Sequence, residues 1–127
     1  MTQNRPVNIN LLKIKLPLSA FLSITHRISG ILIFFIVLPV SVFIFSELTQ
    51  SQDSFNNFMI MYHKNLGIKF GCVGLILIFQ YHIFTGVRHI LMDFHILNAS
   101  LSSSYKSAVT TLVLFAVNAL LTLWVML

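Results

Sequence analysis

Residues 80–93 (QYHIFTGVRHILMD) place histidines, an arginine and an aspartate in and just after a long apolar run. Four of these residues recur at helical spacing and share one face: His82, Gly86, His89 and Asp93. Arg88 lies off that face. An ionisable side chain inside an apolar helix is costly and usually marks a function and a partner. This stretch is therefore the first candidate site.

His82 is the histidine that lies deepest in the apolar run, and it has two interpretations. A neutral imidazole in a dry helix bundle is a good axial ligand for haem iron. The alternative is a histidine hydrogen-bonded to a neighbouring helix. Gly86, one turn away, leaves room either for a flat macrocycle or for a packed helix. One deep histidine supplies one ligand, so a six-coordinate haem requires a second ligand from another chain.

A second polar cluster, SITHRISG (residues 23–30), opens the first apolar run. Ser23 and Arg27 are four residues apart on one face, next to His26. They have the donors to hydrogen-bond a quinone carbonyl; alternatively, Ser23 caps a helix and Arg27 extends to lipid headgroups. Asp93 also has two interpretations. It pairs with a nearby base or a soluble partner, or it is an interfacial carboxylate that faces solvent.

The composition indicates that these clusters lie in membrane helices. Hydrophobic residues make up 57% of the 127 residues and charged residues only 9%, whereas soluble domains carry about 25% charge. The length accommodates about three spans of roughly 20 residues and excludes an additional soluble catalytic domain. The single cysteine, Cys72, excludes an internal disulfide and a CxxC redox pair.

We predict an all-α integral membrane protein with three transmembrane helices, forming a single membrane-anchor domain over residues 1–127. Pro17 suits a helix start, and Pro39 is expected to kink the first span. Polar stretches predict a loop at 47–65 with a short interfacial helix at 55–62, and a connector at 93–106. The predicted segments are an N-terminal surface segment at 1–17 and spans at 18–45, 66–90 and 107–127.

The distribution of basic residues predicts the orientation. Six of the eight Lys and Arg residues fall on the N-terminal side of such a three-span chain, and Lys64 and Lys69 fall on the other. The positive-inside rule then places the N-terminus in the cytoplasm, or in the matrix if the chain is organelle-encoded. The basic residues are scattered around the span ends, so we expect membrane lipid and no nucleic acid as a partner.

Three motifs together resemble one family. RPVNINL (residues 5–11), SITHRISG (23–30) and YHIFTGVRHILMD (81–93) are similar to the cytochrome b membrane-anchor subunits of succinate dehydrogenase, respiratory complex II. The resemblance covers nearly the whole chain in order and with the same number of spans. The patterns SxxHRxSG and HxxxGxRHxxxD are specific when they occur together.

The resemblance implies a set of roles. His82 matches the axial ligand of one haem b, whose second axial histidine comes from a companion anchor subunit. Ser23 and Arg27 match positions of the ubiquinone pocket, and His26 and Arg27 match positions that hold the haem propionates. His89 and Asp93 fit the motif as residues surrounding this site.

The family further implies a flavoprotein and an iron–sulfur subunit docked on the inner face, which pass electrons from succinate to ubiquinone. The chain would not be catalytic alone and would lie in the bacterial inner (cytoplasmic) membrane, or in the mitochondrial inner membrane. Two alternatives remain: a fumarate reductase anchor, and a cofactor-free three-span scaffold or transporter component in which His82 is a packing residue.

Overall fold

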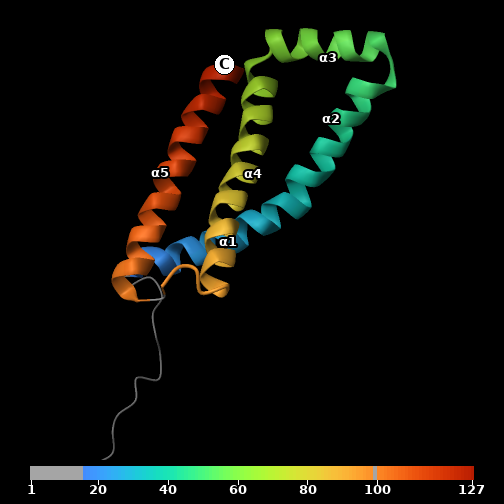
Figure 1. The fold of residues 1–127 in the computed structure, drawn as a ribbon. Helices are drawn as coiled ribbons and strands as arrows, with labels where there is room; N and C mark the ends of the chain where they lie inside the picture. The colour runs from blue at the N-terminus through green and yellow to red at the C-terminus, as the bar shows by residue number, and fades with distance from the viewer. Residues whose placement is uncertain (1–15, 99) are drawn as a thin grey trace, which may run out of the picture.

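The computed structural model describes residues 16–98 and 100–127, and the described chain is all-helical, as predicted. Residues 1–15 of the predicted N-terminal surface segment lie outside the described part. The elements along the chain are α1 (Leu18–Leu32), a π-helical turn η1 (Ile33–Val37), α2 (Leu38–Gln50), α3 (Gln52–Lys64), α4 (Leu66–Asp93) and α5 (Leu101–Met126). In Figure 1, α4 and α5 run side by side, and α3 lies across the opposite end of the bundle from the α4–α5 loop.

Three helical stretches are long and apolar enough to cross a membrane: Leu18–Gln50, Leu66–Asp93 and Leu101–Met126. Their number agrees with the prediction, but each helix runs beyond the predicted span at one or both ends. At about 1.5 Å per residue even the shortest exceeds the roughly 30 Å of a hydrocarbon core. Helical structure therefore continues from the apolar zone into the headgroup zone.

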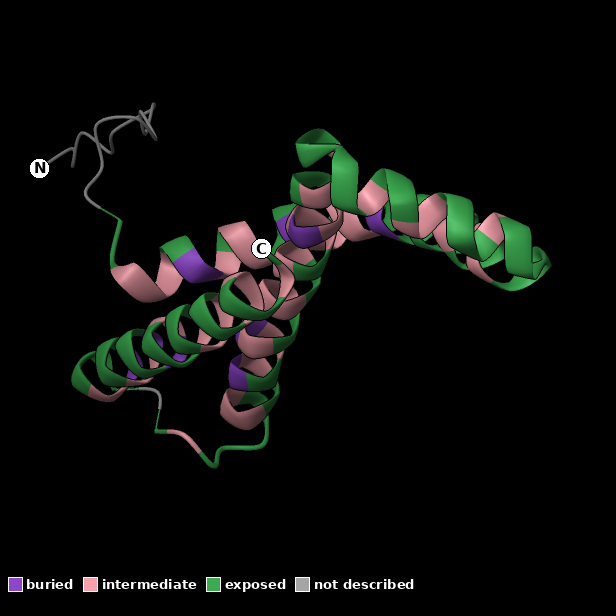
Figure 2. Cartoon of the chain, turned by 90° about the horizontal axis from the view of Figure 1, so that it is seen from above, coloured by how far each residue is buried: buried purple, intermediate pink, exposed green. Residues whose placement is uncertain are grey.

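Large apolar side chains cover the outside of these helices. Phe35 is 69% exposed and Trp124 83% exposed, and Figure 2 shows exposed residues along every helix, with buried ones only where helices meet. The interior is small, with Leu22, Val73 and Ala108 almost fully buried. Such a surface is stable in lipid, where exposed hydrocarbon carries no hydrophobic penalty.

The first span bends at the predicted place, and the π-helical turn before Pro39 gives the physical reason. Proline has no N–H and its ring collides with the carbonyl four residues earlier, which disrupts an α-helix. The turn Ile33–Val37 is widened, and the Leu38 N–H bonds to the Ile33 carbonyl, five residues back. Such π-turns are a recognised cause of helix bends. In Figure 1 the chain changes direction between α1 and α2.

The predicted loop at 47–65 is wrong in extent, because two helices occupy most of it. α2 continues to Gln50, and α3 is a 13-residue helix, longer than the predicted interfacial helix at 55–62. The Ser51 hydroxyl accepts from the Ser54 N–H at 3.1 Å and caps α3. Asn65 caps α4 in the same way, accepting from the Gly67 N–H at 2.8 Å. The two caps therefore confine the turns at either end of α3 to single residues.

The predicted connector at 93–106 is also too long. α4 ends at Asp93 with His95 in the left-handed conformation (φ 58°). The His95 N–H bonds to the Met92 carbonyl and the Ile96 N–H to the Leu91 carbonyl, both at 3.0 Å, which is a Schellman ending. Ser100 then caps α5 by accepting from the Ser103 N–H at 3.3 Å. Only residues 94–100 connect the two helices.

Candidate functional site

Three histidines meet where α1 packs on α4, toward the Asp93 end of the bundle. The rings of His26 and His82 are stacked, with centroids 4.1 Å apart and planes 15° from parallel. The His89 ring lies 5.1 Å from that of His26 and is tilted by 47°. His82 and His89 are two turns apart on α4, and His26 reaches them from α1. We call these three residues the histidine cluster.

Ser29, which is 5% exposed, fixes the proton on the His82 ring. The Ser29 hydroxyl donates to the His26 carbonyl at 2.7 Å and lies 2.9 Å from His82 Nδ1. A hydroxyl has one hydrogen to donate. It therefore accepts from an Nδ1–H of His82, which assigns the tautomer from the hydrogen-bond network. The lone pair of His82 is then on Nε2, the atom that can bind a metal.

Thr85 does the same for His26. Its hydroxyl donates to the Tyr81 carbonyl at 2.8 Å, so it accepts the hydrogen bond from His26 Nδ1, also at 2.8 Å. Thr85 is 1% exposed, so this contact is shielded. Both imidazoles are therefore oriented from the Nδ1 side, and both keep Nε2 as an acceptor.

Two glycines make room for these rings. A Cβ at Gly86 would lie 3.1 Å from Cε1 of His26, and one at Gly30 would lie 3.2 Å from Cε1 of His82. Such approaches are tighter than ordinary van der Waals contact. Of the two interpretations of Gly86 from the sequence, the structure supports close helix packing, because the space beside it is taken by the His26 ring.

A matched pair of substitutions tests this packing. Alanine in place of a helix-interior glycine normally stabilises by about 0.5–1 kcal/mol, and at Gly74 an added Cβ would meet nothing within 4 Å. We expect Gly74→Ala to raise the thermal midpoint of the chain in detergent, followed by circular dichroism. Gly86→Ala should give no increase or a decrease, because it displaces His26. An equal increase in both variants would contradict this arrangement.

The remaining predicted residues lie around the cluster rather than in it. Ser23 is half-buried and Arg27 exposed, one turn apart on α1; Asp93 is exposed, one turn after His89. The alternative in which Ser23 caps a helix is wrong, because α1 begins at Leu18 and Ser23 lies inside it. The sequence therefore located the cluster but did not predict that His26 stacks on His82.

Arg88 lies off the face that the sequence pattern singled out, yet its side chain is only 3% exposed. Its Nη2 donates to the Ser104 hydroxyl and carbonyl, and its Nε to the Ser107 hydroxyl, all at 3.2 Å. Of the bases near Asp93, Arg88 therefore bonds to α5 and does not pair with this carboxylate. The sequence feature that could have indicated these bonds is the pair Ser104 and Ser107, three residues apart on one face of α5.

Tyr81, to which no chemistry was assigned, also contributes a polar contact. Its hydroxyl is hydrogen-bonded to the Thr25 hydroxyl of α1. Tyr81 directly precedes His82, and Thr25 directly precedes His26. This third hydroxyl contact between α1 and α4 therefore lies beside the histidine cluster and helps to fix the two helices relative to each other.

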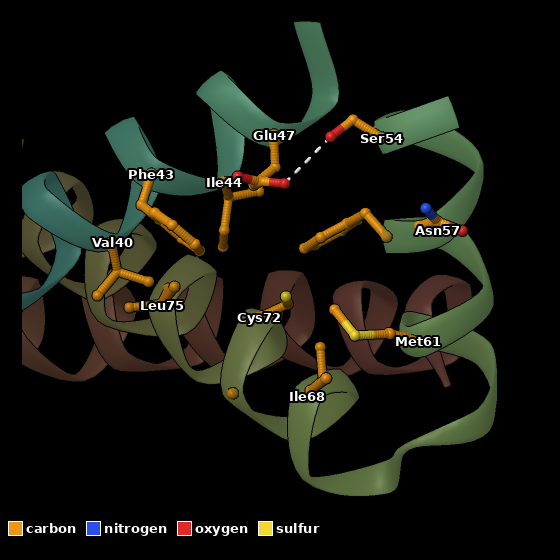
Figure 3. A pocket seen from close by; sticks show the side chains of 12 residues that line it. Val40, Phe43, Ile44, Glu47, Ser54, Asn57, Met61, Ile68, Cys72 and Leu75 are labelled. Atoms are coloured by element: carbon orange, nitrogen blue, oxygen red, sulfur yellow. Dashed lines mark hydrogen bonds between the residues drawn. The ribbon is translucent and has the colours of Figure 1, made fainter. Parts of the chain in front are cut away.

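A separate pocket of about 450 Å³ lies between α2, α3 and α4, toward the end of the bundle that carries α3 (Figure 3). Its walls are mainly apolar, with Phe43 and Leu75 among them. The Glu47 carboxylate at its edge accepts from the Ser54 hydroxyl at 3.2 Å. None of the three histidines lines this pocket, so its chemistry is distinct from that of the cluster.

The fold and the cluster define a small multi-span membrane protein with an oriented polar site between two of its helices. Comparison with known proteins specifies it further. Residues 1–124 match the family described as succinate dehydrogenase/fumarate reductase transmembrane subunit. The chain belongs to this family of membrane anchors.

Individual relatives are consistent with this assignment. The chain is 36% identical over 93 residues to the succinate dehydrogenase cytochrome b556 subunit of Coxiella burnetii, covering 73% of this chain and 74% of that protein. It is 34% identical over 112 residues to the succinate dehydrogenase cytochrome b560 subunit of Porphyra purpurea, covering 87% and 88%. The predicted resemblance to cytochrome b anchor subunits is thereby confirmed.

Proposed function

We propose that this chain is an anchor subunit of a succinate dehydrogenase, that it binds one b-type haem together with a second anchor subunit, and that it forms part of a ubiquinone-reduction site. The observation that carries the proposal is the orientation of His82. Ser29 holds Nδ1–H, so Nε2 is available to the iron. The names of the relatives, cytochrome b556 and b560 subunits, support haem b as the ligand.

The residues of the cluster fit such a group. Haem ligation by histidine uses a neutral imidazole whose other nitrogen is hydrogen-bonded, and His82 meets this requirement. Arg27 at the exposed edge offers guanidinium donors suited to the anionic propionates. His26 would donate to a propionate only as an imidazolium, which carries a proton on Nε2 as well as on Nδ1. The haem, when bound, supplies a one-electron carrier. A histidine of the partner anchor subunit would supply the second ligand to the iron.

Ser23 and Arg27 would bind the quinone. A serine hydroxyl and a guanidinium one helical turn apart can each donate to a carbonyl oxygen, and the charge of Arg27 favours the more negative, reduced forms of the ring. Apolar side chains exposed beside them on α1, such as Ile24 and Ile28, suit an isoprenoid tail. His89 and Asp93, near the same end of the bundle, would surround the haem and quinone sites.

Other subunits would have to supply the redox centres that this chain lacks. With one cysteine it cannot supply the four thiolates of an iron–sulfur cluster. We therefore propose that an iron–sulfur subunit and a flavoprotein dock at the end of the bundle that carries the clusters. The excess of basic residues that the sequence predicts for the N-terminal side supports a position of this end on the cytoplasmic side of a bacterial inner membrane, or on the matrix side in mitochondria.

Purification of the complex through a tag on this chain tests the function. We expect succinate-driven reduction of ubiquinone and a b-type signal in the reduced-minus-oxidised optical spectrum. Faster fumarate reduction by a quinol would favour the fumarate reductase alternative, which the family description includes. A complex with neither activity nor haem absorbance would indicate a cofactor-free scaffold and overturn the proposal.

A further inference from the structure

A groove of about 510 Å³ lies between α4 and α5, and its lining differs along its length. Near the Asp93 end it is lined by Arg88, Lys106 and the hydroxyl residues Ser103 and Ser107. Farther along it is bordered by Phe84 and Leu114, among other apolar residues. Arg88 bonds to Ser104, and Leu114 is ten residues farther along α5, so the apolar part extends by about 15 Å from the cationic end.

The charge of Arg88 is not neutralised by its bonds within the groove. The three hydrogen bonds of this buried side chain go to neutral oxygens of Ser104 and Ser107. They use Nε and Nη2 and leave the Nη1 donors for a further acceptor. A cation removed from water is stable only when hydrogen-bonded and paired with negative charge. The site therefore calls for an anion in addition to the serines.

A second cation adds to the positive charge at this end of the groove. The exposed Lys106 stands at the edge of the groove, and none of the described residues that line the groove is acidic. Arginine and lysine side chains near the end of a membrane helix extend to the headgroups, so the cationic end suits the headgroup zone and the apolar end suits the hydrocarbon. A ligand that matches both ends has an anionic head and a hydrocarbon chain.

We propose that this groove binds one anionic phospholipid, with its phosphate at Arg88 and Lys106 and an acyl chain along Phe84 and Leu114. Guanidinium and ammonium groups are the usual partners of phosphate oxygens, and cationic pockets between membrane helices bind anionic headgroups. The phosphate supplies the negative counter-charge that no described groove residue provides for Arg88, and the lipid holds α4 and α5 together. The proposal does not depend on haem or quinone binding.

The test uses the delipidated, detergent-solubilised complex, with thermal stability measured during titration with phosphatidylglycerol. A ligand that binds only the native state raises the midpoint by an amount that grows with the logarithm of its concentration relative to its dissociation constant. We expect phosphatidylglycerol to protect the wild type at much lower concentration than phosphatidylcholine. Lys106→Gln should raise the phosphatidylglycerol concentration needed by about fivefold, from the loss of one cation near the headgroups. Lys106→Arg should restore it.

Two further variants separate the parts of the site. Lys64→Gln, an exposed lysine of α3 at the opposite end, should leave the titration unchanged. Leu114→Trp, which fills the apolar end, should weaken protection by the lipid. Equal protection by phosphatidylcholine would overturn the role of charge, and equal protection by inorganic phosphate would overturn the role of the acyl chain. Identical titrations for Lys106→Gln and Lys64→Gln would overturn the site itself.

Discussion

His82→Ala is expected to abolish the low-spin b-type signal of the purified complex. The imidazole Nε2 is the iron ligand in our proposal, and alanine has no atom to replace it. Its Nδ1–H is held by Ser29 at 2.9 Å, so the wild-type ring is oriented before haem binds. The reduced-minus-oxidised spectrum, recorded beside quantification of the co-purified subunits, should show either no haem or a high-spin species.

Two other substitutions calibrate this result. Ser29→Ala keeps the ligand but removes the acceptor of its N–H, and loss of such a partner costs about 10- to 100-fold in metal affinity. It should therefore give an intermediate occupancy. His63→Ala alters an exposed histidine of α3 at the other end of the chain and should leave the spectrum intact. A low-spin signal retained in His82→Ala would assign the ligand to a different histidine.

Arg27→Ala should lower succinate-driven ubiquinone reduction by about 10- to 100-fold, the range for one lost charge-assisted hydrogen bond. Electron transfer to a water-soluble dye that accepts upstream of the quinone should be unaffected. Ser23→Ala removes a neutral donor and should have a smaller effect on the same assay. The two activities are measured on one preparation, so their ratio does not depend on the yield of the complex.

Arg27→Lys separates the charge of Arg27 from the geometry of its hydrogen-bond donors. It keeps the charge but loses the planar pair of donors, so it should recover only part of the quinone activity. A parallel fall of quinone and dye activities in Arg27→Ala would indicate defective assembly of the complex. In that case Arg27 would be an anchor to headgroups or to a partner subunit rather than a quinone-binding residue.

The features that the sequence predicted correctly are those set by periodicity within one helix. Apolar runs gave three membrane-length helices, and the spacing of His82, Gly86 and His89 gave their common face. Contacts between helices were not predictable, because they depend on how each helix is rotated about its axis. This is why the stacking of His26 on His82 and the bonds from Arg88 to α5 appear only in the structure.

The extent of α3 was missed for a different reason. A stretch rich in Asn, Gln and Ser looks like a loop by composition, and its amphipathic helix is decided by Ser51 and Asn65 at its two ends. Likewise, His95 occupies a conformation usually taken by glycine, so the end of α4 gave no glycine signal.

The sequence separation within the histidine cluster has a consequence for biosynthesis. His82 and Ser29 are 53 residues apart, and His26 and Thr85 are 59 apart. A growing chain that has inserted α1 but not α4 holds imidazole and hydroxyl groups in the bilayer without these partners, which lipid cannot replace. The cluster is therefore completed late and in one step, when the two helices dock. Until then, His26 of the first helix lacks the hydroxyl that orients its ring.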